Sequence, residues 1–363
     1  MFNLTLRRAL LLSVAVVALV AMFAGLARLG VPVSVAGARA ASHGPLFVLG
    51  VFFPLIALER AVAFGRRAGY VAPILGLVAG LGLVADLPTL RPVCVPAAAA
   101  LVLLNASLWR KQASAHMVLM LAGSVSLLVG SLAWTLGDAV SEVVLCWMTF
   151  FVLTIVAERI ELSRFVAPPR RAVSGLLGVS FVIAGLAAVS LNGDPWSPRA
   201  YGTLLALVGA WVLRYDLARR TLRQHALPRY AAVAALLGAC WLCCSGVLLA
   251  VSGLPVGGPI YDAILHGVFV GFVLSMVFGH APIILPAVAR APMPFHVVLY
   301  SPLLVLHGGL VARWGGDLFG LPLLRQTGGL LSALALVAFP VCAVCARRLE
   351  LAGHDSDHTL GTQ

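Results

Sequence analysis

The chain has 363 residues, of which 61% are hydrophobic and only 10% are charged, and its mean hydropathy is +1.03. A soluble globular protein carries about 25% charged residues, so this composition excludes a soluble domain and predicts a polytopic membrane protein. The net charge of +12 does not indicate nucleic-acid binding, because the arginines lie in loops on one side of the predicted spans.

The first long apolar run follows Arg7 and Arg8 and resembles a signal peptide. The apolar part of a signal peptide is about 7–15 residues long. This run is long enough to cross a bilayer, so we expect a retained first helix. The same length criterion predicts an all-α membrane bundle, with a single domain over residues 1–348. The twelve predicted spans are residues 9–30, 43–64, 69–87, 92–108, 114–136, 140–162, 172–191, 199–217, 229–253, 260–285, 293–313 and 327–348.

The connections between these spans alternate in charge. Every second connection is rich in arginine, whereas the intervening ones carry mainly aspartate and glutamate. Because arginine and lysine accumulate on the cytoplasmic side of membrane proteins, we expect both termini in the cytoplasm. The polar residues 349–363 are expected to form a disordered cytoplasmic tail.

Six histidines lie inside or at the ends of the predicted spans, in two layers. Ionisable residues are costly in a membrane and indicate functional sites, and imidazole is the most frequent metal ligand. Three imidazoles at one depth suit copper, or a heme ligand with copper beside it. Each histidine could equally be a hydrogen-bonded core or interfacial residue. The predicted outer layer is His43, His266 and His307, and the inner layer is His116, His280 and His296.

The tenth and eleventh spans are expected to form an antiparallel hairpin that turns near Arg290. His266 and His280 are 14 positions apart, which is about 21 Å along a helix. Counting outward from the turn predicts that His280 lies level with His296, and His266 level with His307. Neighbouring helices pack about 8–10 Å apart. Contact across the hairpin therefore favours copper, whereas heme would need ligands from more distant helices, such as the second and the tenth.

Three carboxylates accompany the histidine layers. Glu59 and Glu158 lie at the cytoplasmic ends of the second and sixth spans, where they form either ion pairs or a proton entry point. Asp262 lies one helical turn before His266. It is either the partner that holds the second ring nitrogen of a ligating imidazole or a charge at a helix N-terminus.

The second and tenth spans also resemble a known family. The second begins with His43-Gly44 and has Gly50 seven positions after the histidine, and the tenth contains His266-x4-Gly271 and ends with Gly279-His280. Together with twelve spans, these motifs resemble the NnrS family. Its members are heme- and copper-containing membrane proteins associated with the nitric oxide response, distantly similar in layout to the catalytic subunit of heme–copper oxidases.

The resemblance implies a protein of a bacterial cytoplasmic membrane that binds heme, copper or both, in respiratory or nitric-oxide-related metabolism. It implies that His43, His266 and His280 are cofactor ligands, and the depth argument adds His307 to His43 and His266 for a metal. The expected partners are the lipid bilayer and either a redox protein or nitric oxide. Whether the chain is an enzyme stays open. Two alternatives are a b-type diheme electron-transfer subunit and a proton-coupled secondary transporter.

Overall fold

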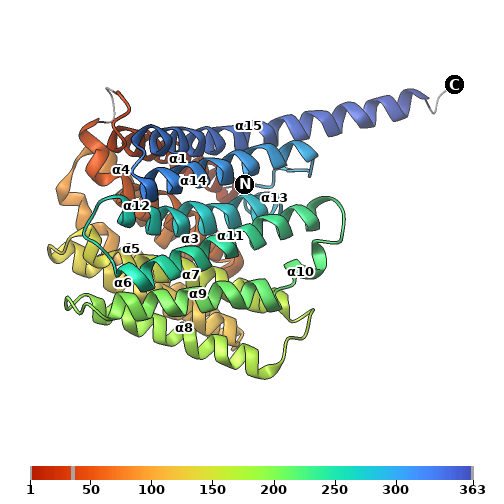
Figure 1. Cartoon of the computed structure of the whole chain (residues 1–363). Helices are drawn as coiled ribbons and strands as arrows, with labels where there is room; N and C mark the ends of the chain where they lie inside the picture. Colours follow the sequence, from red (N-terminus) through yellow and green to blue (C-terminus); the bar gives the residue numbers. More distant parts are fainter. Residues whose placement is uncertain (1, 34–36, 361–363) are drawn as a thin grey trace.

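The computed structural model describes residues 2–33 and 37–360, and these residues contain helices and connections but no strand. The long helices lie side by side in one bundle (Figure 1). Eleven of them are long and apolar enough to cross a membrane, which confirms the predicted all-α membrane bundle. The first half consists of α1 (Phe2–Arg28), η1 (Gly37–Ser42), α2 (His43–Pro45), η2 (Leu46–Phe52), α3 (Phe53–Phe64), η3 (Arg67–Tyr70), α4 (Val71–Ala85), η4 (Pro88–Val93), α5 (Cys94–Lys111), α6 (Ala115–Leu136) and α7 (Val140–Ser163).

The second half of the chain completes the bundle and ends in its longest helix. It consists of α8 (Arg170–Ser190), α9 (Ser197–Tyr215), α10 (Ala218–Thr221), α11 (Ala226–Ser252), α12 (Pro259–His266), η5 (Gly267–Leu274), α13 (Ser275–Ala289), η6 (Val297–Leu299), α14 (Tyr300–Phe319) and α15 (Pro322–Leu360).

The predicted span 199–217 corresponds to α9, a helix of 19 residues that is not among the eleven apolar ones. It runs along α11 (Figure 1). A Cβ added to Gly202 would lie 2.5 Å from the backbone nitrogen of Ala250, so the two backbones are in direct contact there. Small residues permit such close approach between helices in a membrane. The glycine therefore explains why α9 belongs to the bundle although its composition is less apolar.

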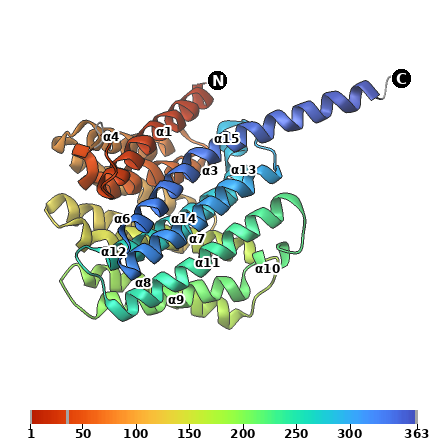
Figure 2. The same cartoon turned by 45° about the horizontal axis from the view of Figure 1, so that its top comes forward.

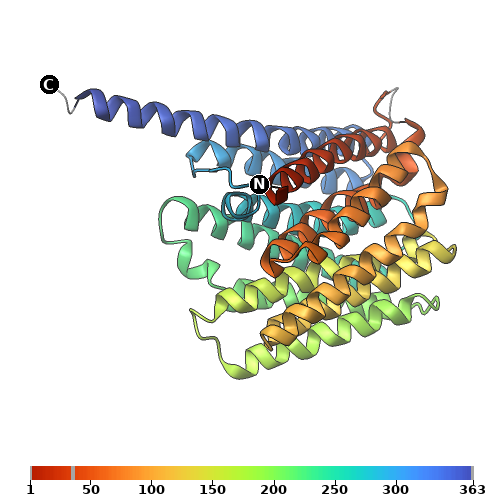
Figure 3. The same cartoon turned by 180° about the vertical axis from the view of Figure 1, so that it is seen from behind.

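The centre of the bundle is α7. Most of its side chains are buried, including the large rings of Trp147, Phe150 and Phe151. In Figures 2 and 3, α8 and α9 lie on one side of it, and α1 and α4 lie on the other. Polar side chains on α7 are therefore removed from lipid and must find partners inside the protein.

Two of the long spans contain a π-helical segment. The span Arg39–Phe64 contains the π-helical segment η2, and the span Pro259–Ala289 contains the π-helical segment η5. A π turn closes i→i+5 hydrogen bonds, so it takes one residue more than an α turn and rotates the side chains that follow it. The direction of the His280 side chain relative to that of His266 therefore does not follow from α-helical spacing.

The last helix, α15, continues to Leu360 and projects beyond the bundle (Figure 1). The sequence analysis instead expected disorder from residue 349. Residues 361–363, the end of that predicted tail, lie outside the described residues.

Candidate functional site: a paired-histidine cavity

His43, the first residue of α2, is held by contacts with α1. Its Nδ1 donates a hydrogen bond to the backbone carbonyl of Ala21 over 2.8 Å. Gly25, one turn further along α1, lies against the edge of the imidazole, and a Cβ added there would lie 2.6 Å from Nδ1. Since Nδ1 carries the proton, the lone pair of the ring is on Nε2.

His266, the last residue of α12, is held in the same way by its own helix. Its Nδ1 donates to the carbonyl of Asp262 over 2.8 Å, and the Oδ1 atom of that aspartate lies 3.4 Å away. Asp262 therefore contacts this imidazole mainly through its backbone carbonyl. The Nε2 atoms of His43 and His266 have no hydrogen-bond partner in the described part of the chain.

These two histidines face each other across one cavity. Their ring centroids are 6.1 Å apart, and their planes differ by 12°. Two metal–nitrogen bonds of about 2 Å and an imidazole radius of about 1.2 Å would place the centroids about 6.4 Å apart. The observed centroid separation is close to this value.

Each histidine of the pair is followed by a π-helical segment. η2 begins three residues after His43, and η5 begins directly after His266. π turns are rare and occur frequently at functional sites. At η5 the extra residue is accommodated by close packing, because a Cβ added to Gly271 would lie 2.5 Å from Trp241.

The cavity has a volume of about 330 Å³ and lies between α1, α2, α7, α12 and α15. Its wall is mainly apolar. The aromatic lining residues are Phe47, Phe52, Trp147, Tyr261 and Phe269.

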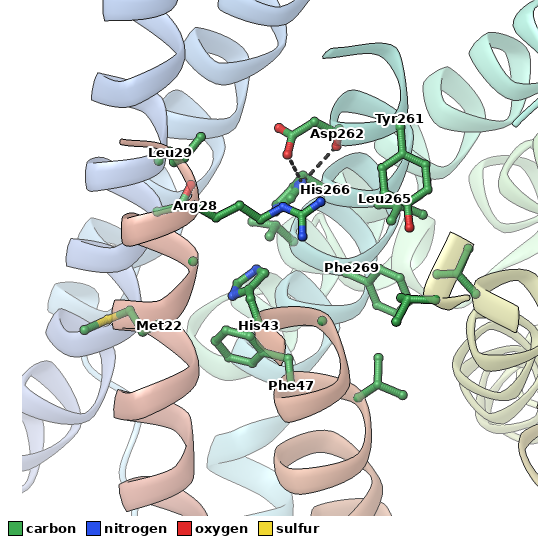
Figure 4. A pocket seen from close by; sticks show the side chains of 18 of the residues that line it. Met22, Arg28, Leu29, His43, Phe47, Tyr261, Asp262, Leu265, His266 and Phe269 are labelled. Carbon is green, nitrogen blue, oxygen red and sulfur yellow. Dashed lines mark hydrogen bonds and ion pairs between the residues drawn. The ribbon is translucent and has the colours of Figure 1, made fainter. Parts of the chain in front are cut away.

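One end of the cavity is lined by charged groups. Arg313, which is only 7% exposed, donates two hydrogen bonds to the Asp262 carboxylate, at 2.7 and 2.9 Å. Arg325 lies 3.5 Å from the same carboxylate and 2.8 Å from that of Asp317. Arg28 reaches across from the end of α1 towards His266 (Figure 4). The Asp262 carboxylate is therefore primarily the partner of Arg313, and its backbone carbonyl is the closer partner of His266.

His307 does not join the pair, contrary to the predicted outer triad. Trp241 Nε1 donates to His307 Nδ1 over 3.0 Å, so Nε2 of His307 carries the proton and faces Ser275 Oγ at 3.2 Å. Both ring nitrogens are thus engaged. His307 lies level with Ser275 rather than with His266, because the residues between α13 and η6 are not helical and shift the hairpin register.

His280 does not join the pair either. Its Nδ1 donates to the carbonyl of Met276, and its Nε2 accepts a hydrogen bond of 3.0 Å from Arg159. Arg159 also forms two hydrogen bonds with Asp216, which is 1% exposed. The predicted ligand role of His280 is inconsistent with this geometry, because its only lone pair is occupied by a guanidinium.

The remaining predicted groups lie outside the cavity. His296 accepts a hydrogen bond from the backbone nitrogen of Val298, at the start of η6. His116 lies 3.6 Å from Glu161. Arg60 pairs with Glu59 at 2.6 Å and with Glu158 at 3.6 Å, as expected for the ion-pair alternative. Among the described residues, no three His, Cys, Asp or Glu side chains are grouped to hold a metal.

Four features around the histidines were not predicted from the sequence: Arg28, Trp241, Arg313 and the Arg159–Asp216 pair. Arg159 and Arg313 are charges within predicted spans, which is a signal for an internal partner. Trp241 gives no such signal, because an indole within an apolar run is ordinary.

The fold and the cavity define an integral membrane protein in which two half-buried imidazoles, from the second and tenth predicted spans, lie side by side in one cavity. The chain belongs to the family described as "Domain of unknown function (DUF8744)", whose model matches residues 7–348. No curated protein and no solved structure matches the chain.

Proposed function

We propose that the chain is an integral membrane heme protein of respiratory or nitric-oxide-related metabolism, in which His43 and His266 would hold the heme iron. The observation that carries this proposal is the pairing of their rings at 6.1 Å, with both Nε2 atoms unpartnered in the described residues. The bacterial cytoplasmic membrane as its location, and the relation to the NnrS family, belong to the same proposal and derive from the resemblance of the two motifs.

The surroundings of the pair support a macrocycle more than a bare ion. A copper ion needs little beyond its ligands, whereas a porphyrin is a broad apolar ring with acidic substituents. The cavity offers an aromatic wall at its centre and guanidinium groups at one end. Copper held by the two imidazoles alone is the other outcome that the experiment below distinguishes.

The residues of the chain set the properties of such a site. The carbonyls of Ala21 and Asp262 fix the Nδ1–H tautomer of the two rings and orient them. Phe52 and Trp147 help to exclude water from the cavity wall. A heme with two imidazole ligands supplies one-electron transfer. This arrangement therefore favours an electron-transfer or sensing role over turnover of a bound gas.

The diheme alternative receives no comparable support. It requires a second pair of imidazoles with free lone pairs, but His280 and His307 have both ring nitrogens engaged.

The test is an optical spectrum of the detergent-purified protein, oxidised and dithionite-reduced, with iron and copper analysis of the same sample. We expect Soret and α bands that are lost in His43→Ala and in His266→Ala. His280→Ala and His307→Ala are matched controls and should retain the bands. If the protein contains copper but shows no Soret or α band, the two histidines bind copper and not heme. A colourless, metal-free protein from cells supplied with both would refute it.

A further inference from the structure

The charged end of the cavity contains an arginine without an acidic partner. Asp262 is engaged by Arg313 and Arg325, and Asp317 is engaged by Arg325. In the described part of the chain, Arg28 is exposed at the mouth of the same cavity and forms no ion pair and no hydrogen bond. Three guanidiniums therefore face two carboxylates, which leaves one positive charge unbalanced beside the paired histidines.

The position of Arg28 is explained only in part by its helix. It is the last residue of α1, where a cation interacts favourably with the helix dipole. That interaction requires only proximity to the helix end. Instead, the side chain extends from α1 towards the cavity, which it lines together with His43 and Tyr261 (Figure 4). An extended guanidinium that faces a cavity is suited to two parallel hydrogen bonds with a carboxylate.

We propose that Arg28 binds a carboxylate of the molecule that occupies the cavity, and that this contact selects a porphyrin with free acid groups over an esterified one. The proposal rests on the proposed function, since it takes the occupant to be a heme. Arg325 is less suited to this role, because Asp262 and Asp317 already flank it. Arg28 is a binding residue in this view, and the two histidines remain the metal ligands.

The experiment compares two porphyrins that differ only in the acid groups. Heme-free protein is titrated with hemin and with its dimethyl ester, and the dissociation constants are obtained from the Soret band. The wild-type protein should bind hemin about ten-fold more tightly than the ester, the size expected for one charge-assisted contact. Arg28→Gln should bind both porphyrins with the affinity that the wild-type protein has for the ester.

Binding of the ester also shows whether the variant cavity is intact, because the ester does not use Arg28. Arg39→Gln is the matched control. It removes the same charge in the connection that follows α1, but its guanidinium pairs with Asp86 and with the carbonyl of Val84. This variant should keep the preference of the wild-type protein for hemin.

The possible failures are distinguishable. If the wild-type protein and Arg28→Gln both bind the two porphyrins equally well, the role of Arg28 is wrong and the proposed function stands. If Arg39→Gln loses the preference as fully as Arg28→Gln, the effect is one of general charge, and the specific contact is refuted. If the wild-type protein binds neither porphyrin, the proposed function fails, and the role of Arg28 fails with it.

Discussion

The imidazoles of His43 and His266 come from the second and tenth predicted spans, yet their ring centroids lie only 6.1 Å apart. Each ring donates its Nδ1 proton to a backbone carbonyl, of Ala21 in one case and of Asp262 in the other. Fixing one tautomer by such bonds raises the basicity of the opposite nitrogen and restricts ring rotation. The two hydrogen bonds therefore hold the rings of the pair in place and leave both Nε2 atoms with a lone pair.

Gly25 should be essential to this geometry. In Gly25→Ala the new methyl group would overlap the His43 ring and displace it from its bond with Ala21. We expect an affinity for the metal or heme about 10–100-fold lower, as for the loss of a supporting group around a metal ligand. Titration of the heme-free protein with hemin measures this affinity. Gly308→Ala, in α14 with open space around it, is the control. Equal affinities in the two variants would contradict the role of the α1 contact.

The buried Arg159–Asp216 pair should stabilise the bundle without affecting the cavity. Arg159→Gln would leave the Asp216 carboxylate buried without its guanidinium partner, and we expect a loss of about 3–5 kcal/mol in the free energy of unfolding. Unfolding in detergent measures this loss, and the optical spectrum should not change. The double variant Arg159→Met/Asp216→Leu should recover most of the stability, since it leaves no unpaired charge. A double variant no more stable than the single one would contradict this account.

His307 should be structural. His307→Leu removes the acceptor of the Trp241 N–H, and an unsatisfied buried donor costs about 1–3 kcal/mol. Thermal unfolding should show this loss, while the chromophore and metal content stay at the wild-type level. Ser275→Ala, which affects only the Nε2 side of the ring, should be milder. If His307→Leu loses the Soret and α bands, the result would instead support the predicted site of three histidines.

The orientation predicted from the arginines can be tested directly. We expect a C-terminal green fluorescent protein fusion to fluoresce, because the C-terminus is predicted to be cytoplasmic. Alkaline phosphatase fused after Gly137, in the connection between α6 and α7, should be active, because that connection is predicted to lie outside. Phosphatase activity from a C-terminal fusion would reverse the orientation and place the charged end of the cavity on the cytoplasmic side.

The spans were predictable because a membrane span depends on local composition and length. Even the alanine-rich span 92–108, with few large apolar residues, is present within Pro88–Lys111. The structure differs from the twelve predicted spans at α9, which is not among the eleven apolar helices. Its contact with α11 depends on Gly202 rather than on hydropathy, and it therefore belongs to the bundle without meeting the apolar criterion.

The sequence by itself determined the fold class and the closeness of Asp262 to His266, because each depends on composition or on spacing within one helix. Only the tertiary structure decided which imidazoles meet. The direction of a side chain beyond a π turn, as in η5, and the register of α14 after a non-helical connection depend on how whole helices pack. The same packing brought Arg159 to His280 and Trp241 to His307, and left His43 and His266 as the pair with free nitrogens.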